Sequence, residues 1–472
     1  MGSPSFDLLA FSKEASGGIP PKKQNSSHEP TGIPPFFKSL QWSADGTTLF
    51  TSSSEKHVSS YVLPETLLEP RDEPLHLKAH STLILGEQTS AIAPCPYFAL
   101  ENPYTHSILT ASYDHPIHLH YAFPQQPSSD DHLTTATHQP PPIASFRLIK
   151  QETEAYLPSA SLIWPAPGTH FIAGTTNRIA IFDVSNPSSL TPEPLFSIAT
   201  IPSTRHIRKG NGIGMRGTVS ALAAQVREDG DAGLIAAGTR TRFMGLYDLQ
   251  RAGECVATWG VAASADEAGI GGGGVTQTVW SPCGRYLVVN ERASSGLLVY
   301  DLRGTNQLLA HLEGRKGDTS QRLSCDVYPG TNAVGGFEVW AGTKDGRVVM
   351  WEGVGNECGA VSPSGGWDAH KSAVGSTAMH ASGSVVATCS GSWEITGDGL
   401  FSDSETGSDS SEEGDSDDSS GSSRSTSEPS SRQSKVSSFV VKETSIKVWR
   451  IGASSSPKGD TPGAGDDNSN GT

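Results

Sequence analysis

The residues of this chain that could take part in binding chemistry are mostly basic, although the chain itself is acidic. Its 472 residues include 34 Lys and Arg against 50 Asp and Glu, a formal net charge of −16. The densest basic cluster is Arg205, Arg208 and Lys209, followed by Arg216, in a stretch interrupted by glycines. A flexible cluster of cations can contact phosphate groups. A solvated loop would have the same composition, so both interpretations stay open.

Other basic residues stand in expected turns. Arg178 follows Asn177 in a tight turn, and Arg240 with Arg242 stands at the equivalent turn of the next unit, in each case just before an apolar strand. Equivalent turns of repeated units lie on one side of a repeat fold, so these side chains could converge on one ligand. Structural salt bridges are the alternative.

Three further candidates have weaker support. Arg292 stands beside Glu291, which offers it a partner of its own. Gln321 and Arg322 precede the expected innermost strand Leu323–Tyr328, which would place them near a channel mouth. A structural role is the alternative for all three.

Histidine and cysteine patterns do not support metal or catalytic chemistry. His118 and His120 would share one face of a strand, but no cysteine or carboxylate pair joins them, and partly buried histidines are the simpler interpretation. His115 could instead lie at a binding rim. The six cysteines contain no C-x-x-C pair, which favours buried thiols in a reducing compartment.

Motifs for enzyme function are also missing from the sequence. The run Gly271–Gly274 lacks the Lys-Ser/Thr that follows in a phosphate-binding loop, and no G-x-S-x-G elbow occurs. No apolar stretch approaches 18 residues, the length typical of a membrane-spanning helix. We therefore expect no enzyme activity, cofactor, metal, small-molecule substrate or membrane association.

Much of the negative charge lies in one segment, 402–437, which holds nine acidic and three basic residues. Four of its hydroxyl residues have an acid three positions later, the pattern preferred by an acid-directed kinase, and these are Ser402, Thr406, Ser410 and Ser425. Each phosphate would add about −1.5 to −2 charges. An unmodified solubilising loop is the alternative. The remainder of the chain is still acidic, so any nucleic-acid contact would be a local patch.

The elements that must position these residues recur as short strands separated by turns. The clearest unit is Thr278–Gly284, Tyr286–Val289 and Leu297–Asp301. Each unit closes on an aromatic residue, and the seven are Tyr61, Tyr121, Phe182, Tyr247, Tyr300, Trp351 and Trp449. One such sheet cannot bury both faces, whereas radial stacking covers each sheet and closure protects the edges. The sequence predicts an all-β, seven-bladed WD40-type β-propeller.

The remaining segments bury too little apolar surface to form a core. Only three strands are visible after Ala373, and the apolar run Phe6–Phe11 is our candidate for the missing outer strand; a partner-binding motif is the alternative. The expected organisation is a mostly disordered N-terminal region at 1–35 with a latch strand at 6–11, a propeller at 36–401 and 439–451, an acidic Ser-rich disordered insertion at 402–438, and a disordered tail at 452–472.

The order of these motifs resembles a specific family, the telomerase Cajal body proteins, also called WD-repeat antisense-to-p53 proteins, with their fungal splicing-associated WD-repeat relatives. The similarity spans roughly residues 36–450. Asp114–His118 and Leu297–Arg303 are more specific than generic WD patterning. The other resembling segments are Phe37–Gly46, Ala111–Leu119, Ala144–Arg147, Asn177-Arg178, Gly245–Tyr247 and Gly296–Arg303.

The resemblance implies a nuclear, monomeric scaffold, present also in nuclear bodies and partly in the cytoplasm. Its partners would be small nuclear or small Cajal-body-type RNAs and the associated ribonucleoprotein proteins, in particle biogenesis, telomerase function or pre-mRNA splicing. The hypothetical RNA-binding residues are His115, Arg178, Arg205, Arg208, Lys209, Arg216, Arg240, Arg242, Arg292, Gln321 and Arg322. A protein-interaction propeller without RNA contact is the alternative.

Overall fold

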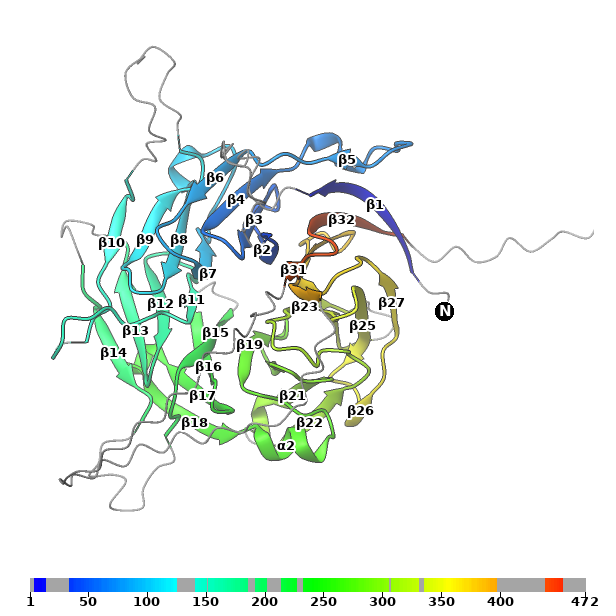
Figure 1. Cartoon of the computed structure of the whole chain (residues 1–472). Coiled ribbons are helices and arrows are strands. Elements are labelled where there is room, and N and C mark those ends of the chain that lie inside the picture. The colour runs from blue at the N-terminus through cyan, green and yellow to red at the C-terminus, as the bar shows by residue number, and fades with distance from the viewer. Residues whose placement is uncertain are drawn as a thin grey trace, which may run out of the picture.

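The computed structural model describes residues 4–13, 34–124, 141–150, 152–185, 192–201, 214–226, 232–304, 307–330, 335–396 and 438–452. These residues form seven sheets of four or five strands around a central axis (Figure 1). The prediction of a seven-bladed β-propeller is confirmed. No helix in the described ranges has the length and apolar character needed to cross a membrane.

Each of the first three blades is a four-stranded antiparallel sheet numbered outward from the axis. Blade 1 consists of β2 (Phe37–Trp42), β3 (Thr48–Ser53), β4 (His57–Val62) and β6 (Ser81–Ile84). Blade 2 consists of β7 (Thr89–Pro94), β8 (Ser107–Ser112), β9 (Ile117–Tyr121) and β10 (Ala144–Phe146). Blade 3 consists of β11 (Ser161–Ile163), β12 (His170–Thr175), β13 (Arg178–Asp183) and β14 (Phe196–Ala199).

The next three blades repeat this plan. Blade 4 consists of β15 (Val219–Val226), β16 (Ala232–Thr239), β17 (Phe243–Asp248) and β18 (Glu254–Gly260). Blade 5 consists of β19 (Val275–Trp280), β20 (Tyr286–Glu291), β21 (Leu297–Asp301) and β22 (Leu308–Leu312), with β26 (Gly359–Val361) added in parallel outside. Blade 6 consists of β23 (Cys325–Pro329), β24 (Phe337–Gly342), β25 (Arg347–Val354) and β27 (Gly365–Asp368).

Blade 7 is assembled from both ends of the described chain. Its order is β28 (Val374–Met379), β29 (Val385–Ser390), β32 (Ser445–Gly452), β1 (Ser5–Ser12) and β5 (Leu75–His76). A two-stranded ribbon, β30 (Glu394–Thr396) with β31 (Ser438–Val440), stands between β29 and β32. The expected closing aromatics lie on the third strand of every blade, from Tyr61 on β4 to Trp449 on β32.

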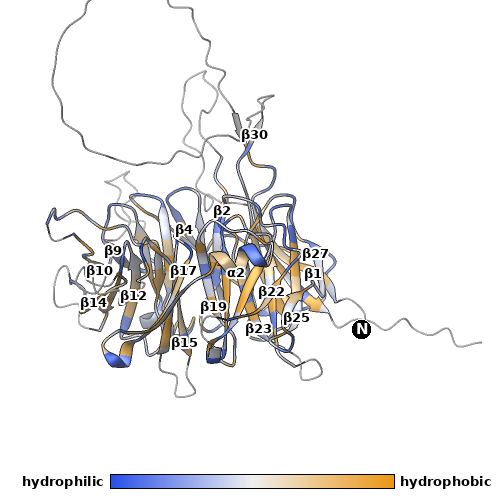
Figure 2. Cartoon of the chain, turned by 90° about the horizontal axis from the view of Figure 1, so that it is seen from below, coloured by the Kyte–Doolittle hydropathy of each residue, from blue (hydrophilic) through white to orange (hydrophobic). Residues whose placement is uncertain are grey.

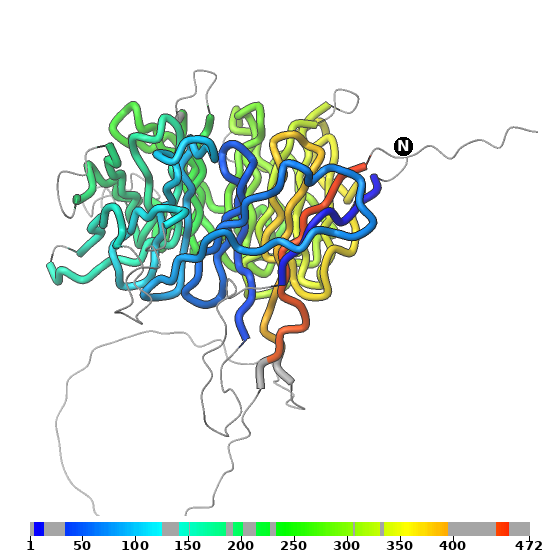
Figure 3. Tube along the Cα trace, turned by 90° about the horizontal axis from the view of Figure 1, so that it is seen from above, coloured from blue at the N-terminus to red at the C-terminus, as the bar shows by residue number. Residues whose placement is uncertain are grey.

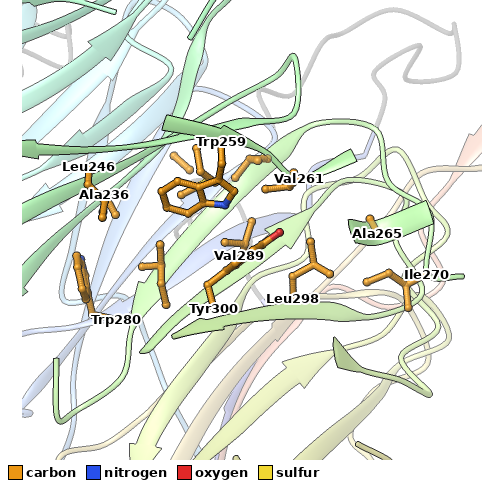
Figure 4. Packing of buried hydrophobic residues seen from close by; sticks show 14 residues of the cluster. Ala236, Leu246, Trp259, Val261, Ala265, Ile270, Trp280, Val289, Leu298 and Tyr300 are labelled. Atoms are coloured by element: carbon orange, nitrogen blue, oxygen red, sulfur yellow. The ribbon is translucent and has the colours of Figure 1, made fainter. Parts of the chain in front are cut away.

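Short helices occur only in connections of the described chain, and they are α2 (Ala262–Glu267) and the 3-10 turns Glu65–Leu68, Pro103–Thr105, Leu249–Arg251 and Leu302–Gly304. The hydrophobic core lies between neighbouring blades (Figure 2). Between blades 4 and 5, the rings of Trp259 and Tyr300 lie 5.5 Å apart, and Ala265 of α2 covers the edge of the cluster (Figure 4). Because inner strands are covered on both faces, all six residues of β3 and of β29 are buried.

The run Phe6–Phe11 lies in the outer-strand position that the sequence suggested. β1 pairs antiparallel with β32, from Ser5 opposite Gly452 to Ser12 opposite Ile446, so the first and last described strands lie side by side (Figure 3). The Phe6 ring stacks on Trp367 of blade 6, with centroids 3.9 Å apart. The strand therefore closes the ring by both backbone pairing and aromatic packing.

A buried polar network joins the two halves of blade 7. Trp449 Nε1 donates to Thr388 Oγ1 at 3.0 Å, and the same hydroxyl lies 2.8 Å from His370 Nε2. The other ring nitrogen, His370 Nδ1, lies 3.0 Å from Ser445 Oγ and 3.4 Å from Glu443 Oε1. Because Thr388 and Ser445 stand on either side of segment 397–437, this network holds β29 and β32 together across it.

We expect Phe6→Ala to lower the free energy of unfolding by about 2 kcal/mol, because it removes a largely buried ring from the closing contact. Chemical denaturation of the full chain measures this change. Asp7→Ala is the matched control, because the neighbouring Asp7 side chain is exposed, and it should change stability by less than about 0.5 kcal/mol. Equal destabilisation by both variants would show that the strand contributes through its backbone alone.

Stability should fall as the pH decreases from 6.5 towards 4. Burial lowers the pKa of His370 from 6.5 to about 4. Between these two pH values, His370 is therefore protonated in the unfolded chain and neutral in the folded chain. This contribution is complete above pH 6.5, and about 2 kcal/mol of it is lost by pH 5. Burial raises the pKa of Glu443, but hydrogen bonds from His370, Lys447 and Ser445 lower it by more. The free energy of unfolding therefore continues to decrease as the pH falls below 4.5.

Urea unfolding of the wild type and of His370→Gln, repeated between pH 4.5 and 7.5, tests this assignment. The variant should be less stable at neutral pH and should show a shallower pH dependence between 6.5 and 4. Other buried histidines contribute equally to both proteins, so the difference isolates His370. An unchanged slope in the variant would contradict the assignment.

Candidate nucleic-acid interface

The topology places two kinds of connection on the same rim of the propeller. In an antiparallel blade, the turn between the second and third strands and the link to the next blade both emerge on the side where the innermost strand begins. We call this side the hairpin rim. The β30–β31 ribbon projects from it (Figure 2). The candidate residues Arg240, Arg292 and Arg322 stand in such connections, and Arg178 is the first residue of β13, directly after one.

A channel of about 640 Å³ runs along the axis and opens on the hairpin rim. Its wall is rich in hydroxyl side chains of the innermost strands, including Ser220, Thr276 and Ser376. Four cationic side chains line it, and they are Lys38, Arg240, Arg292 and Arg322. We call these four residues the cationic mouth. Among the described residues, the guanidinium groups of Arg240, Arg292 and Arg322 have no hydrogen bond or ion pair.

The blade repeat explains why two of these arginines converge. Arg240 directly follows the last residue of β16, and Arg292 directly follows the last residue of β20. In blade 2 the same position, after β8, is occupied by Tyr113, which is 47% exposed and also lines the channel. In blades 2, 4 and 5, the residue that directly follows the second strand therefore lines the mouth.

Electrostatics confirm that the cations crowd one another. The Arg322 side chain reaches solvent, but protein surrounds it in the channel mouth; this enclosure lowers its pKa, and the positive charges of Arg292 and Arg240 lower it further. Burial also lowers the pKa of Lys38, with a further contribution from Arg322. Lys38 Nζ donates to the Thr89 carbonyl at 3.0 Å, which holds it at the wall. An anion in the mouth would relieve this repulsion, so the arrangement favours a polyanionic ligand.

The sequence predicts Glu291 as the partner of Arg292, and this prediction is wrong. Glu291 is paired with Arg242 instead, with Nε–Oε1 and Nη2–Oε2 distances of 2.9 and 3.0 Å, and Asp266 lies 3.6 Å from Arg242 Nη1. Side chains alternate at the end of β20, so Glu291 is only 1% exposed while Arg292 is exposed. The bond to Glu291 raises the pKa of Arg242. Arg242 thus forms a structural salt bridge, the alternative to RNA binding that the sequence left open.

Other candidates lie on the hairpin rim outside the described channel lining. Arg178 begins β13, and Arg216 stands between the hairpins of blades 3 and 4, where its carbonyl accepts a hydrogen bond from Thr241 Oγ1. His115 Nδ1 lies 2.7 Å from the Tyr113 carbonyl and supports that turn. Gln321 lines the channel, but its Nε2 donates to the Gly391 carbonyl at 2.8 Å.

Several predicted residues lie outside the described ranges, and they are Arg205, Arg208, Lys209, Ser402, Thr406, Ser410 and Ser425. The basic segment belongs to the link between β14 and β15, which starts and ends on the hairpin rim. In the described part of the chain, no three His, Cys, Asp or Glu residues are grouped as metal ligands. His118 and His120 share a strand face, with ring centroids 5.6 Å apart.

Sequence reasoning missed two residues of the site, Lys38 and Tyr113. Tyr113 could have been found by superimposing the repeats, because it occupies the position of Arg240 and Arg292 after the second strand. No repeat pattern in the sequence marks Lys38. It lies within β2, and the fold brings it close enough to Arg322, which is distant in the sequence, for the two charges to interact.

Comparison with known proteins gives three informative similarities, while no protein-family model matches the chain. The chain is 24% identical over 328 residues to the Schizosaccharomyces pombe guanine nucleotide-binding protein negative regulator 1, covering 69% of this chain and 72% of that protein. It is 24% identical over 357 residues to human telomerase Cajal body protein 1, covering 75% and 56%. It is 23% identical over 328 residues to Candida glabrata protein SWT21, covering 68% of each.

The match therefore spans little more than half the length of the human telomerase Cajal body protein. It covers most of the propeller of the present chain, which is where the resembling motifs lie. The similarity agrees with the resemblance of those motifs: the chain is a seven-bladed propeller similar in sequence to telomerase Cajal body protein 1 and to these two fungal proteins.

Proposed function

We propose that this chain is a scaffold of ribonucleoprotein particles that contacts RNA through the cationic mouth. The observation that supports this most strongly is the convergence of Lys38, Arg240, Arg292 and Arg322 on one opening of an acidic protein. Arginines bind phosphate oxygens through charge-assisted hydrogen bonds. Unpaired RNA offers phosphates together with exposed base edges, and a recessed polar channel with a cationic opening suits both.

The related proteins suggest the kind of particle. Telomerase Cajal body protein 1 is named for telomerase and for the Cajal body, and the resemblance extends to splicing-associated fungal proteins. By analogy, the partners of this chain are small nuclear or small Cajal-body-type RNAs and their proteins, and its place of action is the nucleus. Its work is particle assembly or trafficking, or pre-mRNA splicing.

A protein-binding propeller that never contacts RNA is the second candidate. It is favoured by an apolar groove of about 300 Å³ on the rim opposite the cationic mouth, lined by Trp164, Pro165 and Val226 among others. The name of the Schizosaccharomyces pombe relative, a negative regulator of a guanine nucleotide-binding protein, also points to a protein partner. Sequencing of RNA crosslinked to the purified protein separates the two: enrichment of small nuclear RNAs supports the first, and messenger background alone supports the second.

Replacing mouth arginines should weaken RNA binding and reduce its salt dependence. We expect Arg240→Ala and Arg292→Ala each to lower the slope of log affinity against log salt by about one, because each removes a phosphate contact. Fluorescence anisotropy with a labelled small nuclear RNA stem–loop measures the slope. Arg303→Ala is the matched control: it removes the same charge from the opposite rim, where Arg303 is paired with Asp301. An unchanged slope in both mouth variants would exclude the mouth as the RNA site.

The basic segment is tested in the same assay. Replacing Arg205, Arg208 and Lys209 together with alanine should weaken RNA retention and flatten its salt dependence, because up to three phosphate contacts are removed. Unchanged retention and slope would show that this segment is not part of the interface, and would leave the cationic mouth as the whole of the proposed site.

A further inference from the structure

Tyr113 is the aromatic residue best placed to meet a ligand at the cationic mouth. It is half-exposed, lines the channel, and belongs to the hairpin between β8 and β9. His115 stabilises this turn, because its Nδ1 lies 2.7 Å from the Tyr113 carbonyl. The imidazole also packs against Gly86, where a Cβ would lie 3.0 Å from Nε2. The backbone that carries the Tyr113 ring is therefore stabilised by contacts of its own turn.

Tyr113 and the arginines line the same opening from different blades. Tyr113 belongs to blade 2, and Arg292 belongs to blade 5. In a ring of seven blades, a separation of three blades is the largest available, so these side chains stand on opposite sides of the channel. Arg240 of blade 4 and Arg322 of blade 6 flank Arg292. A ligand in the mouth thus meets an aromatic face on one side and positive charge on the other.

These two halves match the two halves of a nucleotide. A base has a π-face that stacks on a tyrosine ring, and its phosphate pairs with guanidinium groups. The channel, at about 640 Å³, has the size of a small-molecule site. A paired base already has its edge occupied and its faces stacked in a helix, so a duplex cannot use these groups.

We propose that the mouth captures one unpaired RNA nucleotide, with its base stacked on Tyr113 and its phosphate held by Arg240 and Arg292. This inference rests on the proposed RNA-binding function and adds the class of ligand, an unpaired nucleotide rather than a helix. Arg322 and Lys38 also line the mouth and supply positive charge to the neighbouring phosphates. Tyr113 then determines the preference for unpaired RNA, whereas the arginines determine the affinity for phosphate.

The test compares two RNA probes on the full chain. One is a stem–loop carrying a fluorescent adenine analogue in its unpaired loop, and the other is a fully paired duplex containing the same analogue. We expect tighter binding of the stem–loop and a change in analogue fluorescence when the base stacks. Tyr113→Ala should weaken stem–loop binding about 5- to 150-fold and abolish the fluorescence change. Duplex binding should stay the same.

Two further variants separate stacking from folding. Tyr113→Phe keeps the ring and should bind the stem–loop within about twofold of the wild type, with the fluorescence change retained. Tyr121→Ala removes another exposed tyrosine of blade 2, at the end of β9 on the opposite rim, and should leave both probes unaffected. Unfolding curves of all variants verify that the propeller is intact.

Each outcome decides one of the two proposals. If Tyr113→Ala binds the stem–loop as the wild type does, while the arginine variants bind weakly, the nucleotide inference fails and the RNA-binding function stands. Equal binding of duplex and stem–loop also overturns the inference, as does displacement of the stem–loop by adenosine monophosphate at equal concentration. If the wild type binds neither probe, the proposed function fails with it.

Discussion

Ring closure is the constraint on which the rest of the structure depends. Seven sheets make a channel only if the last blade packs against the first, and here that blade is completed by β1 from the N-terminal end and β32 from the C-terminal end. Without this pairing both strands would be open edges, and blades 6 and 1 would lose their common neighbour. The stacking of Phe6 on Trp367 and the His370–Thr388–Trp449 network reinforce the same joint.

Closure in turn produces the unusual electrostatics of the mouth. Arg242 and Arg240 stand two residues apart in one hairpin, yet Arg242 is neutralised by buried Glu291, whereas Arg240 faces other cations. Unpaired like charges at short range are unfavourable in a protein that has surplus carboxylates available elsewhere. A local arrangement that opposes stability is typical of a binding site, because the ligand supplies the missing counter-charge.

The sequence was sufficient for the architecture and only partly sufficient for the site. Aromatic third strands and turn-bounded apolar runs identified seven blades, and the apolar run at Phe6 suggested the closing strand, since both signals are local. The mouth depends on register across blades. Their adjacency in sequence predicts that Arg292 and Glu291 are partners, whereas the alternation of side chains at a strand end separates them. Lys38 is brought to Arg322 by closure alone, which no local pattern records.

The topology also separates two kinds of surface. Connections between second and third strands form the hairpin rim, where the cations gather, whereas connections between first and second strands form the opposite rim, with the groove at Trp164 and Pro165. The mouth and the groove open on opposite rims, so a ligand at the mouth leaves the outer part of the groove accessible, although both linings include Gln41, Ile92 and Leu162. A propeller of this kind can hold a polyanion and an apolar protein segment at the same time. RNA binding and protein binding are therefore compatible properties of one scaffold, and evidence for a protein partner would not by itself argue against an RNA ligand in the mouth.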